Sequence, residues 1–221
     1  MAPAAPGAPL CVEAQYDENR YELVTRLHEA PAGSWNYEVS FQQAGPSSFL
    51  SFLTQFMGAK SPRVKVFLPR DVPMDLDLRF SQGGGQADLG GLWLSNTKVT
   101  FTQGGGDLRF SEPLARPTGS LTIDASMGGG AFRQIGNASP RELKISAQMG
   151  GGEVDLRGEW QGDCAIRLES RMGGLKVRLP DDVNTAGLPQ DRSRPAADDG
   201  TEAPTLSFSY SESMGEIEFE G

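Results

Sequence analysis

Alternation of apolar and polar residues organises the middle of the chain. From Leu121 to Gly130 the sequence reads LTIDASMGGG, in which every second residue before the glycines is apolar. The segment LKISAQMGGG, from Leu143 to Gly152, repeats this pattern, and alternation resumes behind it with Val154. A period of two is typical of a strand with one buried and one solvated face. Each copy therefore predicts a strand, a glycine corner, a second strand and then a loop.

The copies recur at nearly constant spacing. Glycine clusters begin at positions 83, 104, 128, 150 and 173, which are 21, 24, 22 and 23 residues apart. A degenerate copy of the repeat follows at 208–215. A flat meander of hairpins and a β-solenoid both fit such a unit. The same position of every copy holds the same residue type, as when like residues stack in successive turns. The sequence therefore favours an all-β, single-domain β-solenoid with repeats of about 22 residues.

Three methionines share the parity of the apolar positions in these copies: Met127, Met149 and Met172. Methionine is flexible and fills irregular gaps in a core. We expect the three side chains to lie inside the solenoid, in the space that the side-chain-free glycines leave.

The segments around the repeats predict a capped solenoid. Residues 1–68 form an N-terminal β segment, the repeats occupy 69–180, the polar and Pro-rich stretch 181–204 is a flexible loop, and 205–221 supply a terminal strand pair of the solenoid. Alternation predicts strands at 21–27, 35–41 and 63–68, the last of which enters the repeats.

One stretch of the N-terminal segment departs from the strand pattern. Phe49, Phe52 and Phe56 fall at helical spacing, which predicts a short helix over residues 48–57. The helix either covers an open end of the solenoid, protecting strand edges from aggregation, or docks on a partner or membrane. These three phenylalanines are therefore the candidate partner-binding residues.

Composition and charge exclude several classes of function. The chain has 28 Gly and 15 Pro, which suits many short strands joined by turns, and a net charge of −9 without a cluster of Lys or Arg. Nucleic acids and anionic membranes need such a cluster, so we expect neither nucleic-acid binding nor intrinsic membrane association. Residues 1–10 lack the charged start and apolar core of a signal peptide. An Ala- and Pro-rich opening often follows a removed signal, so we expect an extracytoplasmic location, with the cytoplasm as the alternative.

Candidate chemistry is sparse. The glycine clusters lack the Lys-Ser/Thr pair and the helix of phosphate-binding loops, and their acidic neighbours lack the fixed offset of calcium-binding repeats. His28 is the single histidine, so a multi-histidine metal site is excluded, and no two carboxylates are singled out for acid–base work. Cys11 and Cys164 either form one disulfide or are two free thiols. We expect no catalytic residues, no cofactor and no metal site.

Part of the repeat region resembles a known family. Its sequence motif is similar to that of the toast-rack family of bacterial β-solenoid domains. The matching residues are Leu76–Leu78, Gly83–Gly85, Asp88, Leu89, Leu92, Leu94, Gly104–Gly106, Leu108 and Pro113. This repeat style also occurs in adhesin-like proteins and in membrane-linked regulators of the cell-wall antibiotic response. The resemblance covers roughly 68–180 and implies a β-solenoid of the bacterial cell envelope, without implying any catalytic residue.

The sequence thus predicts a non-catalytic β-solenoid of the cell envelope that presents a surface to a protein or glycan partner. A self-assembling scaffold that stacks through its ends is the first alternative, because the terminal strands of a solenoid have free edges. An enzyme acting on polysaccharides is the second and weaker alternative.

Overall fold

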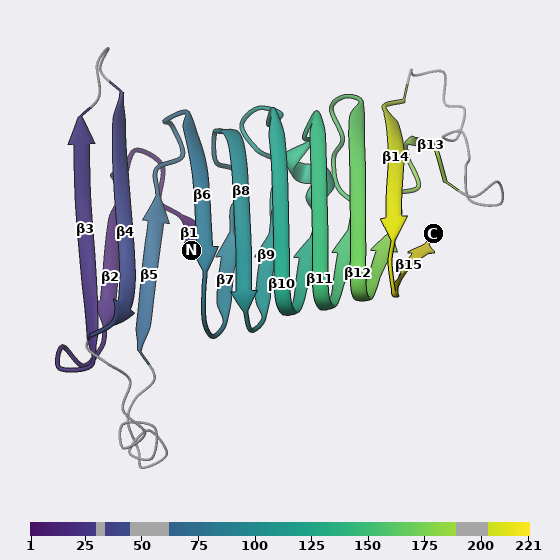
Figure 1. Cartoon of the computed structure of the whole chain (residues 1–221). Coiled ribbons are helices and arrows are strands. Elements are labelled where there is room, and N and C mark those ends of the chain that lie inside the picture. Colours follow the sequence, from purple (N-terminus) through teal and green to yellow (C-terminus); the bar gives the residue numbers. More distant parts are fainter. Residues whose placement is uncertain (30–33, 45–61, 189–202) are drawn as a thin grey trace. The chain divides into compact units, whose positions relative to one another are not determined.

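The glycine-containing repeats stack in parallel and in register (Figure 1). In the computed structural model, Leu121 pairs with Leu143 and that residue with Ile166, while Gly128, Gly150 and Gly173 follow one another at the corner. A parallel partner at the same position of the next copy is what distinguishes a solenoid from a meander of antiparallel hairpins. The chain is therefore an all-β solenoid of about five turns with a repeat of about 23 residues.

The structure describes residues 1–29, 34–44, 62–188 and 203–221, which divide into two compact units. The first unit, Met1–Pro9 with Leu68–Gly221, holds the solenoid, and the second is Leu10–Phe67. The sequence predicted a single domain, whereas the structure has the solenoid and a second compact unit. The strands of the second unit pair with one another in antiparallel fashion, so they add no parallel turn to the solenoid.

Each full turn of the solenoid carries one strand before the glycine corner and one after it. The strands before the corner are β6 (Met74–Phe80), β8 (Leu94–Gln103), the first parts of β10 (Ser120–Arg133), β11 (Glu142–Asp155) and β12 (Cys164–Arg178), then β14 (Thr205–Glu212) and β13 (Asn184–Ala186). The strands after the corner are β7 (Gly85–Asp88), β9 (Gly106–Arg109), the second parts of β10, β11 and β12, and β15 (Gly215–Glu220). We call the two outer surfaces the first face and the second face, in that order.

The core lies between these two layers. Ile123, Ile145 and Leu168 point inward from the first face, and Phe132 and Val177 from the second, all almost completely buried. The predicted alternation of buried and exposed residues is thus confirmed for the straight parts of the strands. Burying a side chain of this size stabilises the fold by about 1.5–3 kcal/mol.

The second compact unit is built of two strand pairs. β2 (Cys11–Gln15) pairs with β5 (Arg63–Leu68), and β3 (Tyr21–Glu29) pairs with β4 (Trp35–Gln43). The rings of Tyr21 and Phe41 stack with centroids 5.3 Å apart. These strands agree with the alternation seen in the sequence.

Two segments predicted from the sequence, the helix and the long loop, lie wholly or partly outside the described residues. The helix predicted over 48–57 lies outside the described residues, within which the sole helical element is a 3-10 turn at Ile135–Ala138. The loop expected over 181–204 begins with structure, because β13 pairs with β14 and Val183 and Leu188 are buried. The rest of that stretch, 189–202, also lies outside the described residues.

The N-terminal residues belong to the first turn of the solenoid. The short strand β1 (Ala2–Pro3) lies against β7, where Asp88 donates its N–H to the carbonyl of Met1 at 3.0 Å. The ammonium of Met1 donates to the carbonyl of Gln86. Desolvation lowers the pKa of that ammonium, against the opposing effect of the Asp88 carboxylate.

Candidate interaction surface

The first face carries three cations in one row that crosses four consecutive strands. Lys98 of β8 pairs with Thr122 of β10, which pairs with Lys144 of β11, which in turn pairs with Arg167 of β12. Neighbouring strands of a sheet lie about 4.8 Å apart, so the row has a regular spacing along the solenoid. The side chains of Lys98, Lys144 and Arg167 are 52%, 44% and 66% exposed.

Carboxylates lie beside this row without locking it: Asp77 of β6 pairs with Lys98 in the sheet, and two others form ion pairs with the cations. Asp124 is 3.8 Å from the ammonium of Lys98, and Glu169 is 3.5 Å from that of Lys144 and 3.8 Å from the guanidinium of Arg167. Exposed ion pairs of this length contribute little to stability, so the cations remain available to a partner. Hydroxyl side chains occupy the neighbouring outward positions: Thr100, Ser146, Ser209 and Ser211.

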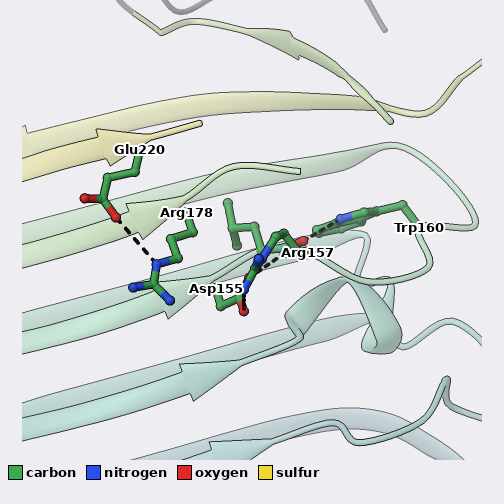
Figure 2. Close-up of polar contacts among 6 residues, drawn as sticks. Asp155, Arg157, Trp160, Arg178 and Glu220 are labelled. Carbon is green, nitrogen blue, oxygen red and sulfur yellow. Dashed lines mark hydrogen bonds and ion pairs between the residues drawn. The ribbon is translucent and has the colours of Figure 1, made fainter. Parts of the chain in front are cut away.

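The second face carries short ion pairs on and beside its last strands (Figure 2). Arg157 holds Asp155 through two hydrogen bonds of 2.8 Å, and Glu220 accepts from Lys176 at 2.7 Å and from Arg178 at 3.5 Å. Burial alone would raise the pKa of Asp155, but the hydrogen bonds and positive charge of Arg157 outweigh it and lower that pKa. The hydrogen bond from Lys176 likewise lowers the pKa of Glu220. Asp155 and Glu220 are therefore already occupied by cations of the same face.

The glycine corner separates the two faces and has a strict geometric demand. Gly104, Gly128, Gly150 and Gly173 have φ values of +112°, +136°, +135° and +145°. A Cβ at any of the four would overlap the carbonyl oxygen of the corner glycine in the preceding turn. Only glycine satisfies both the positive φ and the close approach of the turns.

The methionines that precede these glycines are at the surface, contrary to the expectation that they fill the core. Met127 is 37% exposed, Met149 and Met172 are each 45% exposed, and Met214 before Gly215 is 84% exposed. The space next to the glycines is filled instead by the rings of Phe80, Phe101 and Phe132, which lie against Gly85, Gly106 and Gly130. The chain begins to turn one residue before each methionine, where the pairing of successive turns is interrupted, so parity no longer predicts the inward side.

The C-terminal end of the solenoid shows an edge that is protected. β15 is the last strand of the second face, and the Glu212 carboxylate accepts a 3.0 Å hydrogen bond from the N–H of Ile217. A side-chain carboxylate thus takes the place that the carbonyl of a further turn would occupy. Three glutamates alternate along the same strand: Glu216, Glu218 and Glu220.

The residues singled out from the sequence do not converge. Phe49, Phe52 and Phe56 lie outside the described residues. Cys11 is exposed and Cys164 is buried, and both are free thiols in the structure. Burial raises the pKa of the Cys164 thiol to about 12. His28 is exposed on β3, where it pairs with Asn36 of β4.

Within the described residues, no three His, Cys, Asp or Glu side chains gather in a way that could hold a metal ion. The same part of the chain contains no helix that is long and apolar enough to cross a membrane.

Comparison with known proteins adds little to this description. No family model matches the chain, and none of the curated proteins matches it. The crystal structure of a "putative cell adhesion protein" from Clostridium sporogenes is similar with a TM-score of 0.40 and 12% identity, over 99% of this chain and 85% of that one. At this TM-score the likeness carries no conclusion, and the solenoid architecture rests on the strand register above.

Proposed function

We propose that this chain is a non-catalytic, extracytoplasmic β-solenoid of the toast-rack type whose first face binds an anionic glycan of the bacterial cell envelope. The observation that supports this proposal is the row of Lys98, Lys144 and Arg167, three exposed cations that the register of the strands places in one line, with Thr122 between the first two. A repeating row of cations and hydroxyls is complementary to a polymer that repeats its own acidic and hydroxyl groups.

The composition of this face favours a glycan over a protein partner. The centres of protein–protein interfaces are enriched in aromatic residues, and most of their binding energy comes from buried aromatic and arginine anchors. The outward residues of β10, β11 and β12 on the first face are charged, hydroxyl-bearing, amide or alanine side chains. A partner protein of the envelope remains the alternative, and it would use the same row through carboxylates.

The test compares two triple variants that remove the same charge from opposite faces. The first variant neutralises the proposed row and carries Lys98→Gln, Lys144→Gln and Arg167→Gln. The second variant neutralises three cations of the second face and carries Arg109→Gln, Arg133→Gln and Arg178→Gln. We expect the parent and the second variant to co-sediment with isolated bacterial cell walls, and the first variant to bind at least tenfold more weakly. Equal binding by both variants would refute the assignment of the face, and equal loss would indicate non-specific attraction of charge.

The scaffold alternative requires the C-terminal end of one copy to stack on the N-terminal end of another. At the C-terminal end, the carboxylate of Glu212 already accepts a hydrogen bond from the N–H of Ile217, and the strand β15 presents a row of glutamates. Charged side chains and covered edge groups are the means by which proteins prevent pairing of this kind. These features argue against the scaffold, and light scattering over a concentration series tests it.

The polysaccharide-enzyme alternative is tested by incubating the chain with cell-wall glycans and measuring released reducing ends. We expect no release above a heat-treated control. Export is tested by fractionation of the producing cells, in which we expect the chain outside the cytoplasm.

A further inference from the structure

The exposed methionines form one continuous ladder along the glycine corner. Met127 pairs with Met149, and Met149 pairs with Met172. Met214 precedes Gly215, which pairs with Gly173, so it continues the ladder by one turn. We call these four residues the methionine ladder. They lie at the glycine corner, where the chain passes from the first face to the second, and the corners of β10, β11 and β12 are at the bottom of the solenoid in Figure 1.

Neither packing nor backbone geometry requires methionine at these positions. Gln103 occupies the same position in the preceding turn, where it pairs with Met127, so a polar side chain is tolerated there. Met214 has a φ of 54° and is 84% exposed. A left-handed conformation favours glycine or asparagine over a long side chain. Four of the chain's seven methionines are therefore placed in solvent where the fold does not need them.

What the four side chains share is the thioether sulfur. A thioether is a soft, neutral ligand that selects soft ions such as Cu(I) over Zn²⁺, Mg²⁺ or Ca²⁺. Metal–sulfur bonds are about 2.3 Å long, so two sulfurs on one linear ion lie about 4.6 Å apart. Neighbouring turns are about 4.8 Å apart, and methionine has three rotatable side-chain bonds with which to adjust.

We propose that the methionine ladder binds a soft monovalent metal ion, Cu(I) or Ag(I), between the sulfurs of adjacent turns. The ion is bound without a change of oxidation state, so the site needs no oxidant or reductant. This site is separate from the glycan-binding face, because it lies at the corner between the two faces. Arg171 is the cation next to the ladder in the sequence, and its charge opposes binding of the ion.

The experiment must first remove the exposed thiol, because Cys11 would bind both ions more tightly than a thioether. All proteins therefore carry Cys11→Ser. Ag(I) binding is measured by calorimetry, and Cu(I) binding by competition with a chromogenic chelator under excess ascorbate. We expect the Cys11→Ser parent to bind at least one ion per chain.

Replacing sulfur while keeping apolar volume isolates the thioether. The triple variant Met127→Leu, Met149→Leu, Met172→Leu should bind at least tenfold more weakly, whereas Met74→Leu on β6 should bind like the parent. Gln103→Met, which extends the ladder by one turn, should tighten binding or raise the stoichiometry. Thermal melts check that each variant remains folded.

Methyl-labelled methionine gives a second readout that a structural effect would not produce. Addition of Ag(I) should shift the methyl resonances of Met127, Met149 and Met172 and leave that of Met74 in place. If the leucine triple variant bound the ion with unchanged affinity, the proposal would be overturned. The exposed methionines would then be either an apolar docking surface or without a role in binding. Equal weakening by Met74→Leu, or no effect of Gln103→Met, would overturn it as well.

Discussion

The glycine corner makes the most demanding prediction about this fold. Gly128 has a φ of +136°, and a Cβ there would overlap the carbonyl oxygen of Gly104. In the same corner the N–H of Gly104 donates to the carbonyl of Met127 at 3.0 Å. Gly128→Ala must therefore adopt an unfavourable φ and push two turns apart at a point where they are hydrogen-bonded.

The size of the effect follows from these two contributions. A left-handed φ costs an L-residue about 1–2 kcal/mol. Each weakened backbone hydrogen bond costs about 1 kcal/mol, and about two or three would be affected, because Gly128 also pairs with Gly150 of the following turn. The free energy of unfolding should thus fall by about 3–5 kcal/mol, which is a large effect for a single added methyl group.

The measurement is urea unfolding at 25 °C, followed by tryptophan fluorescence. Trp93 and Trp160 report on the solenoid, and Trp35→Phe in all proteins removes the signal of the second unit. With a slope of about 2 kcal/mol per molar urea, the midpoint should shift down by about 1.5–2.5 M.

Gly162→Ala is the matched control, because its Cβ would meet nothing within 4 Å. It should change stability by no more than about 0.5 kcal/mol, or stabilise slightly by restricting the unfolded chain. If Gly128→Ala proved as mild as this control, the close approach of the turns would not be what the glycines provide, and the argument from the corner would fail.

Three further outcomes follow from single sites. Phe132→Ala removes a ring that is 1% exposed and should lower the free energy of unfolding by about 3–5 kcal/mol in the same urea assay. Glu212→Ala should increase self-association in light scattering, because it uncovers the N–H of Ile217, whereas Glu216→Ala removes the same charge without that effect. Asp155 has a lowered pKa, so its stabilisation is present above pH 4 and is lost as the pH falls through the folded pKa; Asp155→Asn should therefore flatten the loss of stability on acidification.

The sequence predicted the solenoid because its signal is repeated. Leu121, Leu143 and Ile166 stack in the structure as their common position in the repeat implied. One such segment would also have fitted a hairpin, and the agreement among the copies is what excluded it. The N-terminal strands could also be predicted, since Tyr21, Leu23 and Leu27 on β3 and Trp35, Tyr37, Val39 and Phe41 on β4 stand at alternate positions of the sequence.

The position of the methionines was predicted wrongly for a physical reason. Alternation predicts the inward side only while the strand stays extended, and the chain turns immediately before Met127 and Met149. The sequence did contain the opposite signal. Gln82 and Gln103 hold the same position in the first two copies, and an uncompensated glutamine inside the core would be costly. Giving these glutamines more weight than the parity would have placed the row outside.

The row of Lys98, Lys144 and Arg167 could not be read from the sequence in the same way. Thr122 interrupts it, and the three cations come from segments that are 46 and 23 residues apart, since 144 − 98 = 46 and 167 − 144 = 23. Their alignment depends on the register between turns, which varies because the steps between glycine clusters vary. Only the pairing of β8, β10, β11 and β12 brings them into one line.

The repeat therefore separates positions that the fold constrains from positions that it leaves free. Gly128 is constrained, because the backbone of the preceding turn leaves no room for a Cβ there. Phe132 is constrained to be apolar, because its side chain lies in the core. Met127 is free, since its counterpart one turn earlier is Gln103 and its own side chain is 37% exposed. A substitution at a free position changes surface chemistry with little effect on stability. Variants in the methionine ladder and in the cation row should thus alter binding at a nearly constant melting temperature, and any of them that unfolds the solenoid would show that its position belongs to the constrained set.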